Sequence, residues 1–281
     1  MTSTWYTETI QAVERIARDA GALIMRLYDR GEYQAFVKAD ESPVTSADMA
    51  AHRFIIQALE QLTPEVPILS EESEAIEFHV RKQWQRYWLI DPIDGTQEFI
   101  ARSGDFAVNI ALIEDNRPVL GVIFWPAGDT LYAGLAGQGA YKVDATGRQA
   151  IQVRRLADPE QDPLIIAISR RQPRERVKRR MHTERKLKPL PAGSCSLKAC
   201  FIAEGKADCF LRVGPTGEWD TAAAQVIVHE AGGQIVSEAF EPLTYNETAG
   251  LGNPNFLILG DPAVGWRDIF VGPHSSATRR S

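Results

Sequence analysis

The stretch WLIDPIDGTQEF at residues 88–99 passes from an apolar run into two carboxylates and a glycine. The apolar residues that open it are typical of a buried strand. Asp91 and Asp94 follow three residues apart, and Gly95 permits a tight turn directly after them. Thr96 then begins a predicted helix. A strand end, a turn and a helix N-terminus are therefore expected close together.

This junction offers ligands for both a cation and an anion. The carboxylates of Asp91 and Asp94 and the carbonyl of Ile93 can point the same way and supply the hard oxygen ligands that Mg²⁺ prefers. The free N–H groups at the helix start face an anion. Because no sulfur or imidazole lies nearby, zinc is disfavoured. The simpler alternative is a turn whose aspartates only cap the backbone and meet water.

The chain has 281 residues, a hydrophobic fraction of 44% and a formal net charge of −6. This length suits one large domain or two modest ones, and the composition excludes general disorder. The negative charge gives no overall case for nucleic-acid binding. The first residues lack a secretory signal, and no run is long enough to span a bilayer. We therefore expect a cytoplasmic protein, and peripheral attachment to the cytoplasmic side of the inner membrane stays open.

Hydrophobic periodicity predicts a mixture of amphipathic helices and short strands. A polar segment with two prolines, residues 156–163, is the predicted boundary between an N-terminal half, 1–156, and a C-terminal half, 157–281. The helices are expected at 6–28, 46–63, 196–204 and 221–231, and the strands at 35–38, 67–70, 87–90, 106–113, 119–124, 131–135, 140–143, 151–153, 164–168, 207–211, 234–236 and 256–259.

Five carboxylates stand at the ends of these predicted elements: Asp48, Glu71, Asp91, Asp94 and Asp220. Each has an ordinary explanation taken alone. Asp48 complements a helix dipole, Glu71 meets solvent at a strand end, and Asp220 is a natural N-cap for the helix at 221–231. Gathered in one place they would repel strongly, and such a cluster persists only if cations neutralise it.

A basic block interrupts the C-terminal half between residues 170 and 188. A solvated helix face is the preferred interpretation, because no aromatic residues interleave for stacking on nucleic-acid bases. Electrostatic attraction of a multiply charged small anion is a weaker alternative. The block comprises Arg170, Arg171, Arg174, Arg176, Lys178, Arg179, Arg180, Arg185, Lys186 and Lys188.

Three ordered motifs together, at residues 69–73 (LSEES), 91–96 (DPIDGT) and 218–223 (EWDTAA), resemble the inositol monophosphatase superfamily of Mg²⁺-dependent, lithium-sensitive phosphatases. The likeness spans roughly Ala12 to Leu259. Further segments resemble the CysQ branch of that superfamily, the bacterial 3′(2′),5′-bisphosphate nucleotidases. These segments are 95–99 (GTQEF), 108–113 (VNIALI), 196–198 (SLK) and 214–216 (GPT).

The resemblance implies a layered αβαβα sandwich with the active site in the cleft between its two halves. It implies that Thr96, with Asp48 or Glu71, orients and deprotonates an attacking water. It assigns two or three Mg²⁺ ions to Glu71, Asp91, the Ile93 carbonyl, Asp94 and Asp220. It assigns substrate contacts to Ile93, Asp94, Gly95, Thr96, Lys198, Arg212 and Asp220, with the Gly95 and Thr96 N–H groups on the scissile phosphate and Lys198 and Arg212 on the rest of a nucleotide.

The chain departs from the nucleotidase pattern beside the substrate. Gln97 replaces a usual Lys, Cys195 stands where a substrate-facing Ser is common, and Leu211 replaces a common Pro. The turn at 193–196 is one residue longer than the pattern. These departures leave the metal ligands intact and bear on substrate choice.

The resulting hypothesis is a phosphatase that removes the 3′-phosphate of 3′-phosphoadenosine 5′-phosphate, a by-product of sulfate assimilation. An inositol monophosphatase or another small phosphate-ester phosphatase is the alternative of the same class. A catalytically silent nucleotide-binding or scaffold protein, and an RNA-binding protein that uses the basic block, are alternatives of other classes. The expected partner is a small nucleotide, without nucleic acid or an integral membrane segment. The sequence does not decide between monomer and homodimer.

Overall fold

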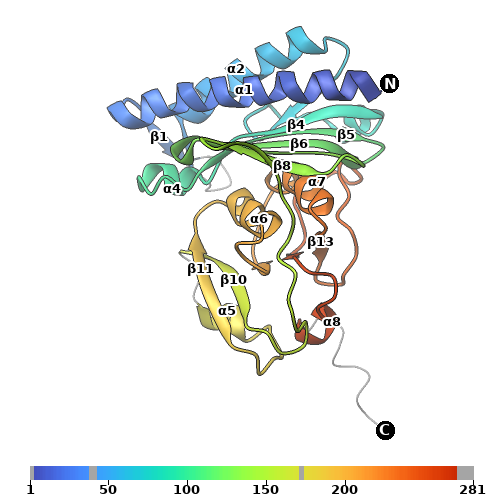
Figure 1. The fold of residues 1–281 in the computed structure, drawn as a ribbon. Helices are drawn as coiled ribbons and strands as arrows, with labels where there is room; N and C mark the ends of the chain where they lie inside the picture. Colours follow the sequence, from blue (N-terminus) through green and yellow to red (C-terminus); the bar gives the residue numbers. More distant parts are fainter. Residues whose placement is uncertain (1–2, 38–42, 171–173, 271–281) are drawn as a thin grey trace.

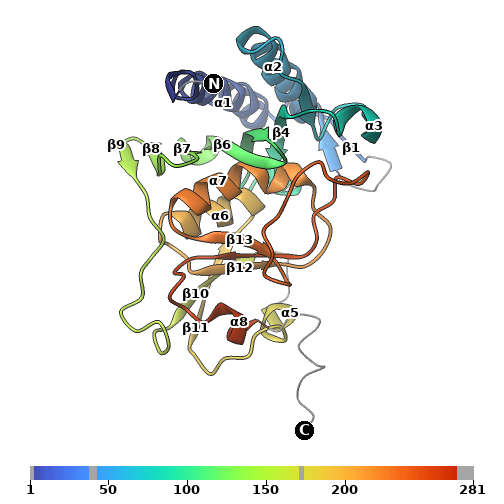
Figure 2. The same ribbon diagram turned by 90° about the vertical axis from the view of Figure 1, so that its right-hand side faces the viewer.

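Helices and sheets alternate in layers in the computed structural model, which describes residues 3–37, 43–170 and 174–270 (Figures 1 and 2). A helix pair lies on a seven-stranded sheet, a second helix pair fills the space between this sheet and a five-stranded sheet, and short helices cover the far side. The expected αβαβα sandwich is confirmed. None of the helices in the described ranges combines the length and the apolar character that a membrane span requires.

The outer pair is formed by α1 (Ser3–Arg30) and α2 (Ser46–Leu62). Val13 and Ile24 of α1 and Ile55 of α2 have no exposed surface, which confirms the amphipathic pattern of both helices. Their apolar stripes pack on strands β4 to β7 of the seven-stranded sheet. The first turn of α2 carries the buried side chain of Asp48.

The seven-stranded sheet has the order β3-β4-β5-β6-β7-β8-β9, in which β3 is parallel to β4 and the other pairs are antiparallel. The last strand is β9, and residues 151–153 lie beyond it, so the strand predicted there is wrong. The bounds are β3 Ile68–Ser70, β4 Arg86–Asp94, β5 Ala107–Glu114, β6 Arg117–Trp125, β7 Thr130–Leu135, β8 Ala140–Asp144 and β9 Gly147–Ala150.

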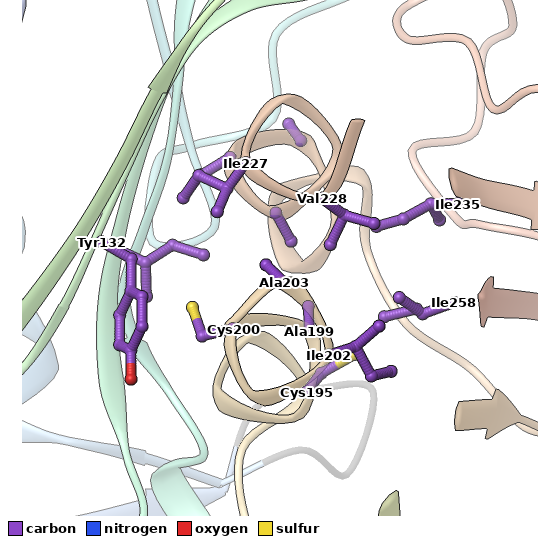
Figure 3. Close-up of a cluster of buried hydrophobic side chains, with 14 of the residues drawn as sticks. Tyr132, Cys195, Ala199, Cys200, Ile202, Ala203, Ile227, Val228, Ile235 and Ile258 are labelled. Carbon is purple, nitrogen blue, oxygen red and sulfur yellow. The ribbon is translucent and has the colours of Figure 1, made fainter. Parts of the chain in front are cut away.

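The inner helix pair, α6 (Cys195–Ala203) and α7 (Ala222–Glu230), approaches the seven-stranded sheet closely. Gly121 of β6 faces α7, where a Cβ atom would lie 2.3 Å from a backbone oxygen of the helix. A side chain at this position would therefore push the helix away from the sheet. Figure 3 shows the shared core, with Tyr132 on the first sheet, Ile227 on α7 and Ile258 on the second sheet.

The five-stranded sheet has the order β11-β10-β12-β14-β13 and draws only on residues after 163. The seven-stranded sheet draws only on residues before 151, although a division into two independent halves at residue 156 stays a prediction. The bounds are β10 Leu164–Ser169, β11 Leu187–Ala192, β12 Cys209–Arg212, β13 Gln234–Ser237 and β14 Phe256–Leu259. The remaining elements are β1 Ala35–Val37, β2 Pro43–Thr45, α3 Phe78–Arg81, α4 Thr96–Ile100, η1 Pro126–Gly128, α5 Arg174–Lys178, η2 Glu218–Asp220 and α8 Trp266–Ile269.

Candidate metal and phosphate site

Strand β4 continues through the motif that was expected to follow it. Asp91 pairs with Asn109 on β5 and Asp94 pairs with Ala107, so β4 carries one residue more than β5 over this interval. Residues three apart on a regular strand point to opposite faces, because side chains alternate. The bulge offsets this alternation and brings both carboxylates to the same place. The two aspartates were predicted to converge, but a bulge within a strand brings them together rather than a turn after it.

Asp220 joins these two aspartates from the other half of the chain. One oxygen from each of Asp91, Asp94 and Asp220 lies within 4.8 Å of the others. Asp220 ends the 3₁₀ turn η2, and its Oδ2 accepts a hydrogen bond from Gly217 N at 2.6 Å. Thr221, not Asp220, occupies the N-cap of α7, so the capping prediction for Asp220 is wrong. Its carboxylate is directed to the acidic cluster because the preceding turn folds back on itself.

The acidic cluster has too few donors of its own. Asp91 Oδ1 accepts a hydrogen bond from Ile93 N at 3.0 Å, whereas Asp91 Oδ2 is buried without a hydrogen-bond partner among the described residues. Burial, and then the neighbouring carboxylates, raise the pKa of Asp91 and of Asp220 well above the usual range. A buried carboxylate oxygen without a donor, facing other carboxylates, fits a hard divalent cation. The candidate metal ligands Asp91, Asp94 and Asp220 all offer oxygen atoms, as expected from the sequence.

Glu71 lies directly after β3 and lines one pocket together with the three aspartates. It stands outside the group of three mutually close carboxylates, but its charge contributes to the raised pKa of Asp91 and of Asp220. Parallel pairing of β3 with β4 brings the two strand ends to one edge, Ser70 beside Ile90. This pairing explains how a residue twenty positions earlier reaches the cluster.

Thr96 and Asp48 form a pair beside the cluster. Thr96 Oγ1 lies 3.1 Å from Asp48 Oδ1, to which it donates, and 3.2 Å from the Ile93 carbonyl. The other oxygen of Asp48 accepts hydrogen bonds from the N–H and hydroxyl groups of Thr45 in a capping box at the start of α2. Burial raises the pKa of Asp48 despite these donors. The Asp48 carboxylate therefore both takes part in capping α2 and contacts Thr96.

The pocket above the carboxylates has a volume of about 390 Å³. Lys198 and Arg212, the two cationic residues that the resemblance assigns to the substrate, line it. The Lys198 ammonium donates to the carbonyls of Gly193 at 2.5 Å and Ser194 at 2.7 Å, and burial lowers its pKa. Arg212 donates through one terminal nitrogen to a carbonyl in the next loop, and its Nε is buried without a partner in the part of the chain that the structure describes. Gly95, Gln97 and Cys195 also line this pocket.

Two residues of the site escaped sequence reasoning. Ser194 donates to Asp94 Oδ2 at 2.5 Å, and Asp105 holds the turn on which Ser194 lies. Ser194 directly precedes α6, which begins one residue earlier than predicted, and a serine near a helix start is a capping signal that could have drawn attention to it. Nothing in the spacing of Asp105 links it to this turn, because the two segments meet only in the folded chain.

The basic block does not form one solvated helix face, because α5 covers only Arg174–Lys178 of it. Arg185 donates to two backbone carbonyls, Arg180 pairs with Glu238, and Arg170 pairs with Asp105 at 2.8 Å. Arg171 and the side chains of Arg174 and Arg176 lie outside the described residues. Several of the described arginines therefore serve the fold rather than an open nucleic-acid surface.

The layered fold and the cluster of carboxylate ligands agree with what comparison with known proteins finds. The model of the inositol monophosphatase family matches residues 5–259. The chain belongs to this family, as its three ordered motifs predicted.

Three similar proteins within the family are named CysQ. The 3′(2′),5′-bisphosphate nucleotidase CysQ of Haemophilus influenzae is 41% identical over 258 residues, which cover 91% of this chain and 94% of that protein. The protein of the same name from Escherichia coli K12 is 42% identical over 250 residues, which cover 89% and 98%. The crystal structure of CysQ from Bacteroides thetaiotaomicron superposes with a TM-score of 0.74 at 33% identity and covers 90% of this chain and 97% of that one.

Proposed function

We propose that this chain is a Mg²⁺-dependent 3′(2′),5′-bisphosphate nucleotidase that hydrolyses the 3′-phosphate of 3′-phosphoadenosine 5′-phosphate to give AMP and phosphate. The observation that carries the proposal is the unpartnered Asp91 oxygen among buried carboxylates, at the base of a pocket that also holds cationic side chains. The names of the similar proteins support the same substrate class. A cytoplasmic location and a complement of two or three ions remain predictions.

The residues that would hold the ions are Glu71, Asp91, the Ile93 carbonyl, Asp94 and Asp220. When bound, Mg²⁺ offsets the negative charge on the phosphoryl group and on the leaving oxygen during in-line transfer. The protein's own contribution is to fix the positions of the reacting groups. The close approach of the three aspartates and the buried, donor-poor oxygen of Asp91 support this assignment.

Thr96 and Asp48 would manage the proton of the attacking water. Thr96 Oγ1 donates to Asp48 Oδ1, and the lone pairs of the hydroxyl stay available to orient a water. As the water oxygen bonds to phosphorus, its proton passes to Thr96 while the Thr96 proton passes to Asp48. The bond between phosphorus and the 3′ oxygen would break, that oxygen would take up a proton from solvent water, and Asp48 would later release its proton to solvent. The raised pKa of Asp48 favours this role.

The second phosphate of the substrate would lie toward Arg212 and Lys198. The buried Arg212 Nε lacks a partner within the described residues, and a phosphate oxygen would supply one. Lys198 contributes positive charge from a fixed position, because backbone carbonyls hold its ammonium. The N–H groups of Gly95 and Thr96 are the proposed contacts for the scissile phosphate. The scissile phosphate would thus lie at the metal site, and the second phosphate would lie at the cationic side chains of the same pocket.

A panel of phosphate esters tests the proposal. Phosphate release would be measured from 3′-phosphoadenosine 5′-phosphate, inositol 1-phosphate and AMP, each with Mg²⁺ and with excess EDTA. We expect fastest turnover of the bisphosphate and none with EDTA. Preference for inositol 1-phosphate would favour an inositol monophosphatase instead. Nucleotide binding without turnover would favour a silent binding protein, and salt-dependent RNA retention would favour RNA binding.

A further inference from the structure

One oxygen of Asp94 is fully occupied by donors from the other half of the chain. Ser194 Oγ donates to Asp94 Oδ2 at 2.5 Å, and Ser196 N donates to the same oxygen at 2.7 Å. Charge-assisted bonds of this kind are strong and directional. Two donors on one oxygen fix the plane of the carboxylate and leave the other oxygen, Oδ1, available to a cation.

The turn that presents Ser194 is itself held rigidly. Ser194 is buried and caps α6, with its hydroxyl accepting from Leu197 N at 3.1 Å. Its own N–H donates to the Asp105 carbonyl at 3.1 Å, and Gly193 N donates to Asp105 Oδ2 at 2.9 Å. A Cβ atom on Gly193 would lie 2.5 Å from the Asp105 Cβ, so only glycine fits there. Side chain and backbone of one aspartate therefore fix two consecutive residues of the turn.

Opposite charges brace this turn from its two sides. Arg170 Nε donates to Asp105 Oδ2 at 2.8 Å, so the carboxylate that holds Gly193 is itself oriented by a cation. The Lys198 ammonium donates hydrogen bonds to the carbonyls of Gly193 and Ser194. The N–H groups of the turn thus meet an anion and its carbonyls meet a cation. This network is more than a single helix cap requires.

We propose that Ser194 is a positioning residue that orients Asp94 toward a bound divalent cation, and that Asp105 with Arg170 anchors the turn on which Ser194 lies. The inference rests on the proposed role of Asp94 as a metal ligand. Partners behind a metal ligand set its orientation, and their loss typically lowers metal affinity about 10- to 100-fold. The affinity for Mg²⁺ should then depend on a hydroxyl group that does not touch the ion.

Calorimetric titration of the EDTA-treated, dialysed protein with Mg²⁺ alone tests this inference. We expect Ser194→Ala to bind Mg²⁺ about tenfold more weakly than the wild type. Ser194→Gly should show the same loss, and it disturbs the helix cap less, because glycine is tolerated at N-caps. Arg170→Gln, at a half-exposed position, should show a smaller loss in the same direction and carries the least risk to folding.

Thr63→Val is the matched control. It also removes one buried hydroxyl at a helix end, where Thr63 accepts from Trp88, but it lies outside the pocket. This variant should lose melting temperature and keep the wild-type affinity for Mg²⁺. Wild-type affinity in both Ser194 variants would overturn the inference and reduce Ser194 to a helix cap, while the proposed function would stand. A wild-type protein that binds no Mg²⁺ would instead defeat the proposed function and this inference with it.

Discussion

Two sets of aspartates in this chain have opposite surroundings. Asp208 receives two hydrogen bonds from Arg154, at 2.8 and 2.6 Å, and a further one from a backbone N–H. Asp261 likewise receives Arg155 and two backbone N–H groups, which lower its pKa although burial alone would raise it. Each of these carboxylates is neutralised by the chain itself.

Asp91 is as deeply buried as these two aspartates and Asp220 is partly buried, but both have carboxylates for neighbours, and burial and that repulsion raise their pKa values well above the usual range. Within the described residues each accepts a single hydrogen bond, from Ile93 N and Gly217 N respectively. Asp91 thus shares its residue type and its burial with Asp208 and Asp261, and the source of positive charge is what differs. The comparison teaches that burial of an acid points to a functional site only where the chain withholds the counter-charge.

The largest expected effect is loss of turnover when the pocket loses a charge. Asp94→Asn should lower kcat/KM for the bisphosphate about a thousandfold or more, because cation binding supplies several kcal/mol of transition-state stabilisation. Steady-state kinetics across a Mg²⁺ series would measure it. Asp208→Asn is the control on the neutralised side and should keep its specific activity once corrected for folded protein. Wild-type turnover of Asp94→Asn at ordinary Mg²⁺ would remove Asp94 from the site.

A smaller effect should follow from Thr96→Val, which keeps the shape of the side chain and deletes the hydroxyl. We expect kcat to fall about a hundredfold, the usual size of a lost proton-transfer group. Affinity for Mg²⁺, measured by calorimetry, should fall much less than kcat, because Thr96 Oγ1 contacts Asp48 and the Ile93 carbonyl but none of the three clustered aspartates. A fall in metal affinity with unchanged kcat would assign Thr96 a different role.

On the neutralised side, Asp261→Asn should destabilise the protein by about 1–3 kcal/mol at pH 7, because charged hydrogen bonds are lost in a buried place. The folded-state pKa of Asp261 lies below 3.8, so its contribution is complete above that value and disappears as pH falls through the folded pKa. Denaturant unfolding at pH 7 and at about pH 3 would show the difference from wild type shrink. An equal difference at both values would contradict the assignment.

The smallest effect has the opposite sign. In EDTA, Asp91→Asn should stabilise the protein by about 1 kcal/mol at pH 7.5, because it removes a repelled charge. The pKa of Asp91 is raised in the folded state, so metal-free wild type should lose stability as pH rises through that pKa. Thermal melting between pH 5 and 8 would measure both trends. Destabilisation by Asp91→Asn in EDTA would show that the chain neutralises this carboxylate after all.

Local patterns predicted most helices and strands and the nearest pair of ligands, whereas the layered αβαβα arrangement was predicted from the family resemblance. Periodicity placed α1 and α2, and the spacing of Asp91 and Asp94 within one short motif made their convergence readable. Asp48 and Glu71 entered the site through resemblance. Their own positions are equally consistent with a helix cap and a solvated strand end.

The rest depends on contacts that only the folded chain creates. The bulge in β4 arises from its register with β5, and no residue of the motif announces it. Ser194 and Asp105 meet across 89 residues of chain through the pairing of a turn with the start of β5. The incorrect prediction that Asp220 is an N-cap has the same origin, because its carboxylate accepts a hydrogen bond within the preceding 3₁₀ turn.

The most direct test of the account is an anomalous difference map from a crystal soaked in Mn²⁺, which substitutes for Mg²⁺ at carboxylate sites. We predict a peak bounded by Asp91, Asp94 and Asp220 and none beside Asp208 or Asp261. A map without a peak at the three aspartates, at an Mn²⁺ concentration that sustains turnover, would contradict the claim that cations supply the charge that the chain withholds there.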